Sequence, residues 1–233
     1  MGSEFRVNLD GDEVPVFVRR NARAKRLTLR IDRSTGDIKL TLPLFVRSSA
    51  AERFLASHTD WIKRERAAVE PLVVVTDGSY LPYLGIQHKV QFSGISPRHV
   101  QVVDGVILVG GPADVAGKRL ENWLKAEAKR LLSERAEFHA DKLGVSHGRI
   151  SIGDMKSRWG SCSSTGGLRF SWRLLLAPFD VLDYVAAHEV AHLREMNHSE
   201  RFWAAVSETI PDYKVRRKWL KTEGNKLFNI CFS

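Results

Sequence analysis

Hydrophobic and polar residues alternate along much of the first half of the chain, which predicts β-strands with one buried face. The alternation is clearest in Leu27–Ile31 and Ile38–Leu42, and Gly36 between them favours a hairpin turn. Over residues 48–70 the apolar positions follow a helical spacing instead, and short strands then resume. We therefore expect residues 6–110 to form a β-rich region that contains one helix.

The second half of the chain follows a longer repeat. Apolar residues at helical spacing predict one long helix from about Asp114 to Leu143, which Gly144 ends. Two strands joined by a glycine turn follow, and residues 180–193 then carry an apolar helical stripe. Gly110-Gly111-Pro112 precedes the long helix, so we expect residues 111–233 to form a second region, either separate from the first or continuous with it. The mixture of strands and helices predicts an α+β fold.

The composition narrows the class of protein. The chain has 233 residues and a net charge of +9, which favours acidic partners such as nucleic acid but also promotes solubility. No run of about 18 apolar residues occurs, so we expect no membrane association. Residues 1–5 resemble a cloning remnant, and no signal-peptide core follows them. Two cysteines, Cys162 and Cys231, are too few for a disulfide framework, and a cytoplasmic location is expected.

Two histidines in the helix predicted at residues 180–193 suggest a metal site. His188 and His192 lie four residues apart, so their imidazoles point the same way and can hold one Zn²⁺ at about 2.0–2.1 Å each. Glu189 follows the first histidine and can act as a general base toward water, as in H-E-x-x-H zinc hydrolases. A chain that turns back after this helix would bring His198 to the metal as a third ligand.

A second group of residues precedes that helix. Arg158, Trp159 and Ser161 are unusual choices for a plain core strand, so we interpret them as substrate-binding residues on an edge strand above the metal, where an extended peptide pairs by its backbone. A hydrolase also needs a donor that stabilises the oxyanion. Arg158, Arg173 and Tyr184 are the candidates, and the sequence does not choose among them.

Four motifs occur in a fixed order: Arg158–Cys162, His188–His192, Asn197-His198-Ser199 and Phe202-Trp203. This set resembles the YgjP-like metallopeptidase family, relatives of the SprT-like and WLM zinc proteases, over about residues 20–225. The resemblance implies a zincin-like catalytic core that uses zinc and acts on protein or peptide substrates. It also implies that His188, His192 and His198 bind the metal and that Glu189 is the glutamate of the motif.

The chain departs from the metzincin pattern after His192. Glu195 stands where metzincins carry glycine, and no methionine follows His198, so we expect Asn197 to make the turn in a left-handed conformation. A downstream helix carboxylate, as in gluzincins, is the competing third ligand, and Glu208 and Glu223 are the candidates.

Two other functions remain open at this stage. One is a non-catalytic, zinc-stabilised module that binds nucleic acid through its basic segments, Arg19–Arg30 and Lys214–Lys226. The other is a latent protease that acts on DNA-bound proteins, as some SprT-like and WLM relatives do. Glu189 distinguishes the first function from a peptidase. A structural zinc site needs no general base, and it instead needs a fourth protein ligand, such as Cys162, that closes the coordination shell.

Overall fold

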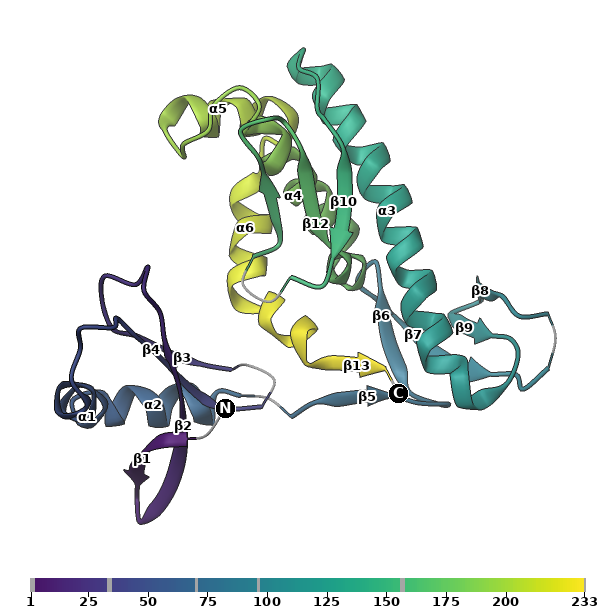
Figure 1. The fold of residues 1–233 in the computed structure, drawn as a ribbon. Helices are drawn as coiled ribbons and strands as arrows, with labels where there is room; N and C mark the ends of the chain where they lie inside the picture. The colour runs from purple at the N-terminus through teal and green to yellow at the C-terminus, as the bar shows by residue number, and fades with distance from the viewer. Residues whose placement is uncertain (1–2, 33–34, 70, 96, 156–157, 233) are drawn as a thin grey trace. The chain divides into compact units, whose positions relative to one another are not determined.

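The computed structural model describes all residues except 1–2, 33–34, 70, 96, 156–157 and 233. The chain forms two compact units, Met1–Leu72 and Val73–Ser233, and Figure 1 labels most of their helices and strands. Both units combine helices with sheets, which confirms the expected α+β class. None of the described helices is both long and apolar enough to cross a membrane.

Unit 1 is a sheet covered on one face by two helices. Its elements are β1 (Ser3–Leu9), β2 (Asp12–Arg20), β3 (Thr28–Ile31), β4 (Ile38–Leu42), α1 (Ser48–Ala56) and α2 (Thr59–Ala67), with strand order β1-β2-β4-β3. The expected hairpin is present, since β3 and β4 are antiparallel and Gly36 has a φ of +74°. Alternate strand residues such as Val16 and Leu40 are buried together with Leu55 and Ile62 of the helices.

The one helix expected at residues 48–70 is two helices, and that prediction was wrong. The Ser57 hydroxyl donates to the carbonyl oxygen of Phe54 at 2.9 Å, and Nδ1 of His58 lies 2.8 Å from the same oxygen. These local bonds end α1 before α2 begins, as side chains that bond to nearby carbonyls commonly do. Residue 70 lies outside the described residues.

Unit 2 begins with short strands that pack against a long helix. They are β5 (Val73–Val75), β6 (Tyr80–Tyr83), β7 (Ile86–Phe92), β8 (Val100–Val103) and β9 (Val106–Val109), followed by η1 (Ala113–Val115) and α3 (Ala116–Leu143). Leu81 and Ile107 of the strands share one buried cluster with Leu120 and Leu124 of α3. This packing explains why the compact units divide after Leu72 rather than after residue 110 as the sequence suggested.

A three-stranded sheet, three α-helices, two 3₁₀ helices and a final strand complete unit 2. They are β10 (Ile150–Gly153), β11 (Gly160–Cys162), β12 (Leu168–Ser171), η2 (Trp172–Leu176), α4 (Phe179–Ala191), α5 (Glu200–Thr209), α6 (Tyr213–Thr222), η3 (Gly224–Asn229) and β13 (Ile230–Phe232). The strand order β10-β12-β11 leaves β11 at an edge beside α4, and β13 pairs in parallel with β5. Gly144 ends α3 at a φ of +61°, as expected.

A buried charge cluster joins α3 to α4. The carboxylate of Asp183 accepts a hydrogen bond from Arg135 Nε at 2.6 Å and lies 2.7 Å from Nε2 of His139, which is fully buried. Burial alone would raise the pKa of Asp183, but the hydrogen bonds from His139 and Arg135 outweigh it and hold that pKa below its usual value. The charged form of Asp183 therefore stabilises the contact between the two helices.

We expect Asp183→Asn to lower the free energy of unfolding by on the order of 3 kcal/mol at neutral pH, because Arg135 would lose its charged partner. A lowered carboxyl pKa contributes stability that is complete above the unfolded-state value of about 3.9 and is lost as pH falls through the folded-state value. The difference between parent and variant in urea unfolding should therefore shrink below about pH 4.

Glu134→Gln is the matched control, because Glu134 pairs with Arg130 at 3.2 Å on the exposed side of the same helix α3. Such surface pairs contribute little to stability. Equal losses in both variants, or a difference that does not change with pH, would contradict the stabilising role of Asp183.

Candidate metal centre

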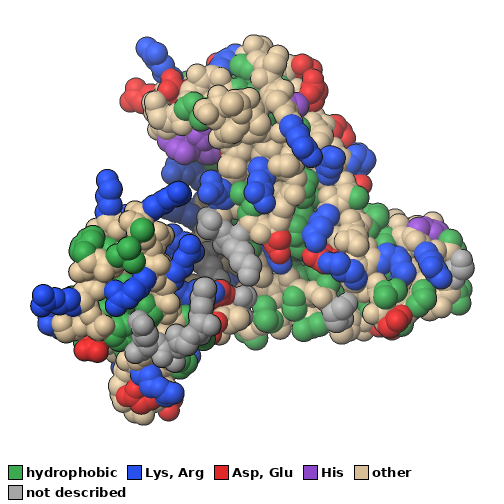
Figure 2. All heavy atoms as spheres, viewed as in Figure 1, with side chains coloured by type: hydrophobic (Ala, Val, Ile, Leu, Met, Phe, Trp, Pro, Cys, Tyr) green, Lys and Arg blue, Asp and Glu red, His purple; other side chains and the backbone are tan. Residues whose placement is uncertain are grey.

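Three histidines from two segments of unit 2 meet at one point. The nearest ring nitrogens of His188, His192 and His198 all lie within 4.8 Å of one another. Nε2 of His188 is 3.1 Å from Nε2 of His198, and the ring centroids of His192 and His198 are 4.8 Å apart. Figure 2 shows purple histidine side chains on the surface of unit 2, where α5 and the start of α6 lie in Figure 1.

The spacing and chemistry of these nitrogens fit a metal ion. Tetrahedral zinc with bonds of about 2.0–2.1 Å holds its ligand nitrogens roughly 3.3 Å apart, close to the observed separation of His188 and His198. Burial, with His192 and His198 nearby, lowers the pKa of His188 to about 3. Its ring is therefore neutral near pH 7, which is the form that binds metals.

Other groups orient the imidazoles. Nδ1 of His192 lies 3.1 Å from the carbonyl oxygen of Glu195, and Nδ1 of His188 lies 3.5 Å from the Tyr184 hydroxyl. Contacts to Nδ1 leave Nε2 of each ring free to face a metal, and hydrogen bonds of this kind fix the ring orientation.

Phe202 supports all three rings from beneath. Its centroid lies 4.9, 4.5 and 4.7 Å from those of His188, His192 and His198, and its side chain is fully buried. Ser199 caps α5 by accepting a hydrogen bond from the Phe202 amide at 3.4 Å. The helix start therefore places both His198 and Phe202.

The turn that brings His198 back does not use a left-handed asparagine, so that prediction was wrong. Asn197 has no positive φ. Its side-chain oxygen instead accepts a hydrogen bond from the Ser199 amide at 2.9 Å, and its amide nitrogen donates to Glu195 at 2.7 Å. A local side-chain bond of this type replaces the glycine turn.

Glu189 is a buried carboxyl next to the histidines. It is only 5% exposed, and burial raises its pKa to about 8, while the charge of Arg158 opposes the shift. A Cβ atom on Gly160 would lie 2.5 Å from both Cγ and Oε1 of Glu189. Only glycine leaves room for this carboxyl under β11. We did not single out Gly160 from the sequence, although a lone glycine within a strand is a sign of close approach.

The three residues expected to bind substrate have different surroundings: Arg158 and Trp159 directly precede β11, and Ser161 lies within it. Arg158 is exposed, and Ser161 is partly buried opposite Arg169 of β12. Trp159 stacks on Phe228 at 4.6 Å between centroids and contacts Gly224. Trp159 thus packs against η3.

Several other candidates lie away from the histidines. Glu208 pairs with Arg194 at 2.8 Å and Glu223 with Lys226 at 2.9 Å, and neither carboxylate belongs to the histidine group. Arg173 is buried and bound to Asp154 and to the carbonyl oxygens of Leu227 and Ile230. In the part of the chain that the structure describes, the only group of this kind that could hold a metal is the three histidines.

Comparisons with known proteins identify the family of the chain. A family described as the YgjP-like metallopeptidase domain matches residues 25–223. Two solved structures are similar to parts of the chain. The metallopeptidase zymogen of Pyrococcus abyssi abylysin is 24% identical, with a TM-score of 0.36, over 40% of this chain and 95% of its own. The metallopeptidase zymogen of Methanocaldococcus jannaschii jannalysin is 21% identical, with a TM-score of 0.34, over 39% of this chain and 91% of its own. No curated protein matches. The family match spans most of the sequence, and the chain belongs to the YgjP-like metallopeptidase family.

Proposed function

We propose that this metallopeptidase is zinc-dependent, with His188, His192 and His198 as the metal ligands and Glu189 as the general base. The observation that carries the proposal is the convergence of three imidazoles beside a buried carboxyl from the next residue of α4. A zinc ion held there would supply Lewis-acid activation of water and of the peptide carbonyl.

Glu189 moves the proton in this scheme. As a carboxylate it accepts a proton from the attacking water, and the nearby charge of Arg158 favours that form. It then delivers the proton to the departing amine. The burial that raises its pKa suits this second task, because the carboxyl must hold the proton until the C–N bond breaks.

The edge strand β11 is the proposed substrate platform. One side of β11 pairs with β12, from Gly160 opposite Phe170 to Cys162 opposite Leu168. Its other side has no strand partner within the described residues. An extended peptide can add to that side by backbone hydrogen bonds, next to Glu189.

Arg158 is the oxyanion donor that we favour among the three candidates. It is exposed and its charge acts on Glu189, whereas Arg173 is bound to Asp154. Tyr184 is only 4% exposed, so it supports His188 rather than reaching a substrate. The buried base also favours catalysis over a purely structural zinc site, and Cys162 does not join the histidine group as a fourth ligand.

We expect His198→Ala to weaken zinc binding by orders of magnitude, because it removes one of three ligands. Competition with a chromophoric chelator measures the affinity. His147→Ala is the control, since His147 bonds to Glu137 and Gly148 away from the site. Unchanged affinity in His198→Ala, with loss in Glu208→Gln or Glu223→Gln, would move the third ligand to a carboxylate.

Glu189→Gln should keep zinc and fold but lower peptide hydrolysis by about 10²–10⁴-fold, because the amide cannot accept the proton. Zinc content, thermal unfolding and cleavage of an unstructured protein such as casein are compared with the parent. Glu200→Gln removes one exposed charge near the site and serves as control. Cleavage by Glu189→Gln at the parental rate would show that another group is the base.

We also propose weak nucleic-acid binding by the outer sheet face of unit 1. Strand alternation buries Val16 and directs Phe17 and Arg19 outward, and the register sets Phe17 and Arg30 opposite Lys39. Phe17 is 36% exposed among these cations. A ring that can stack on bases, surrounded by charges that attract phosphates, suits a single strand without sequence preference.

The second basic segment, Lys214–Lys226, supports this proposal less. Arg216 pairs with Asp180 and Asp212, and Lys226 pairs with Glu223, so part of its charge is already neutralised. We therefore confine the proposed surface to the sheet of unit 1.

The double variant Arg19→Gln/Arg30→Gln should bind an oligothymidine more weakly than the parent, with a salt slope lower by about 1–2, because it removes two phosphate contacts. Fluorescence anisotropy at two salt concentrations measures both quantities. Arg53→Gln/Arg64→Gln changes the net charge equally on the exposed helices α1 and α2 and is the control. Equal weakening by both double variants, or no binding by the parent at low salt, would contradict this surface.

A further inference from the structure

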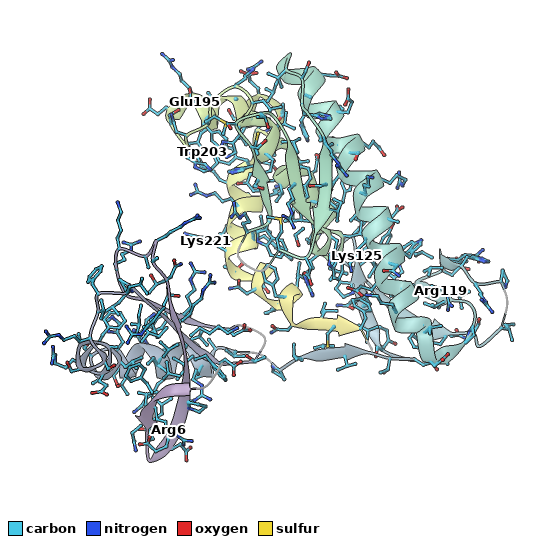
Figure 3. The ribbon with its side chains drawn as sticks, viewed as in Figure 1. Arg6, Arg119, Lys125, Glu195, Trp203 and Lys221 are labelled. Carbon is cyan, nitrogen blue, oxygen red and sulfur yellow. The ribbon has the colours of Figure 1, made fainter. Side chains whose placement is uncertain are left out.

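An arginine on α6 lies at the border of the histidine cluster. The guanidinium of Arg217 lies 4.6 Å from the centroid of the Trp203 ring. Trp203 in turn packs 5.7 Å from His198 and 5.8 Å from His188, measured between centroids. Figure 3 labels Trp203 where α5 approaches the start of α6.

Two aromatic contacts fix the Trp203 ring, against which the Arg217 guanidinium packs. Tyr213, one turn before Arg217 on α6, stacks on Trp203 with centroids 5.0 Å apart and planes 12° from parallel. Phe202 meets Trp203 edge to face at 5.0 Å. A guanidinium held against a fixed indole loses little further freedom when it binds a ligand.

The charge of Arg217 acts on the site but has no acidic partner. Burial, His192 and His198 lower the pKa of His188, and the charge of Arg217 adds to that shift, while it opposes the rise in the pKa of Tyr184 that burial causes. Its neighbour Arg216 pairs with Asp180 at 3.0 Å and with Asp212 at 2.5 Å. Arg217 is exposed and makes no ion pair with any residue that the structure describes.

We propose that Arg217 is a specificity residue that binds a carboxylate of the peptide substrate beside the metal centre. The proposal rests on the proposed peptidase function and names the substrate class of that same site. A guanidinium offers two parallel N–H donors that match the two oxygens of a carboxylate. An unpaired arginine fixed next to a catalytic centre therefore favours substrates that carry one.

The carboxylate can come from an Asp or Glu side chain or from the C-terminus of the peptide. A peptide library in which each position is held in turn as Asp, Asn or Lys, with the C-terminus either free or amidated, separates these sources. Binding is measured by fluorescence anisotropy on zinc-loaded Glu189→Gln protein, and initial cleavage rates are measured on the zinc-loaded parent.

We expect peptides with a carboxylate at one position or at the C-terminus to bind about five- to tenfold more tightly than their neutral counterparts. Adding Arg217→Gln should remove this preference, and Arg217→Glu should turn it toward Lys peptides. Lys218→Gln, one residue along the same helix and exposed, removes the same charge and should leave the preference unchanged. Arg217→Lys keeps the charge without the planar donor pair and should retain only part of it.

Each result bears on a separate proposal. The role of Arg217 is overturned, while the peptidase proposal stands, by any of three results. The carboxylate preference survives Arg217→Gln, or Lys218→Gln removes it equally, or the parent shows no carboxylate preference at all. If the Glu189→Gln protein binds carboxylate peptides through Arg217 but the parent cleaves none, the peptidase proposal fails and the role of Arg217 stands. If no peptide is bound or cleaved, both are overturned.

Discussion

The burial of α4 is the constraint on which the site depends. Ten of its residues are buried, between α3, the β10–β12 sheet and the later helices, and the helix is packed on nearly all sides. A helix enclosed in this way cannot turn about its axis without breaking those contacts. His188 and Glu189 are successive residues and point in directions about 100° apart. The position of α4 therefore fixes both the His188 ring, which lies next to His198, and the Glu189 carboxyl, which lies under β11.

Polar groups in this enclosed helix have distinct surroundings, and these set their chemistry. Hydrogen bonds with Arg135 and His139 offset the burial of Asp183 and keep its carboxyl charged, so Asp183 holds α4 against α3. Glu189 has only the more distant charge of Arg158 to offset its burial, and its pKa rises to about 8. Two carboxyls on one helix thus differ because one has hydrogen-bonded cations and the other does not. An uncompensated carboxyl contributes little to stability, which is typical of a group kept for catalysis.

Local patterns in the sequence predicted a large part of this arrangement. The helical spacing of apolar residues indicated α3 and α4, and the four-residue interval of His188 and His192 indicated a shared face, because both are properties of a single helix. The break between α1 and α2 was missed because it depends on the hydrogen bonds that the Ser57 and His58 side chains make to the Phe54 carbonyl oxygen. The unit boundary was missed because it depends on β6–β9 packing against α3 far along the chain.

Long-range contacts account for what the motifs did not indicate. Glu208 and Glu223 have the residue type of a metal ligand, but Arg194 and Lys226 pair with them. Gly160 and Phe202 lie within motifs of the sequence, but their roles, like that of Arg217, come only from contacts with other elements. No single-sequence pattern encodes such pairs.

The segment formed by η3 and β13 supports the site through contacts with residues far away in the sequence. Trp159 stacks on Phe228 and meets Gly224, so η3 holds the residue directly before Gly160. Arg173 binds the carbonyl oxygens of Leu227 and Ile230, which ties η3 and β13 to the strand-to-helix connection before α4. The edge strand over Glu189 and the helix that carries Glu189 are therefore held from the same short segment. Gly160 can approach the carboxyl closely only while both remain in place, so η3 and β13 belong to the support of the site although they supply none of its proposed ligands.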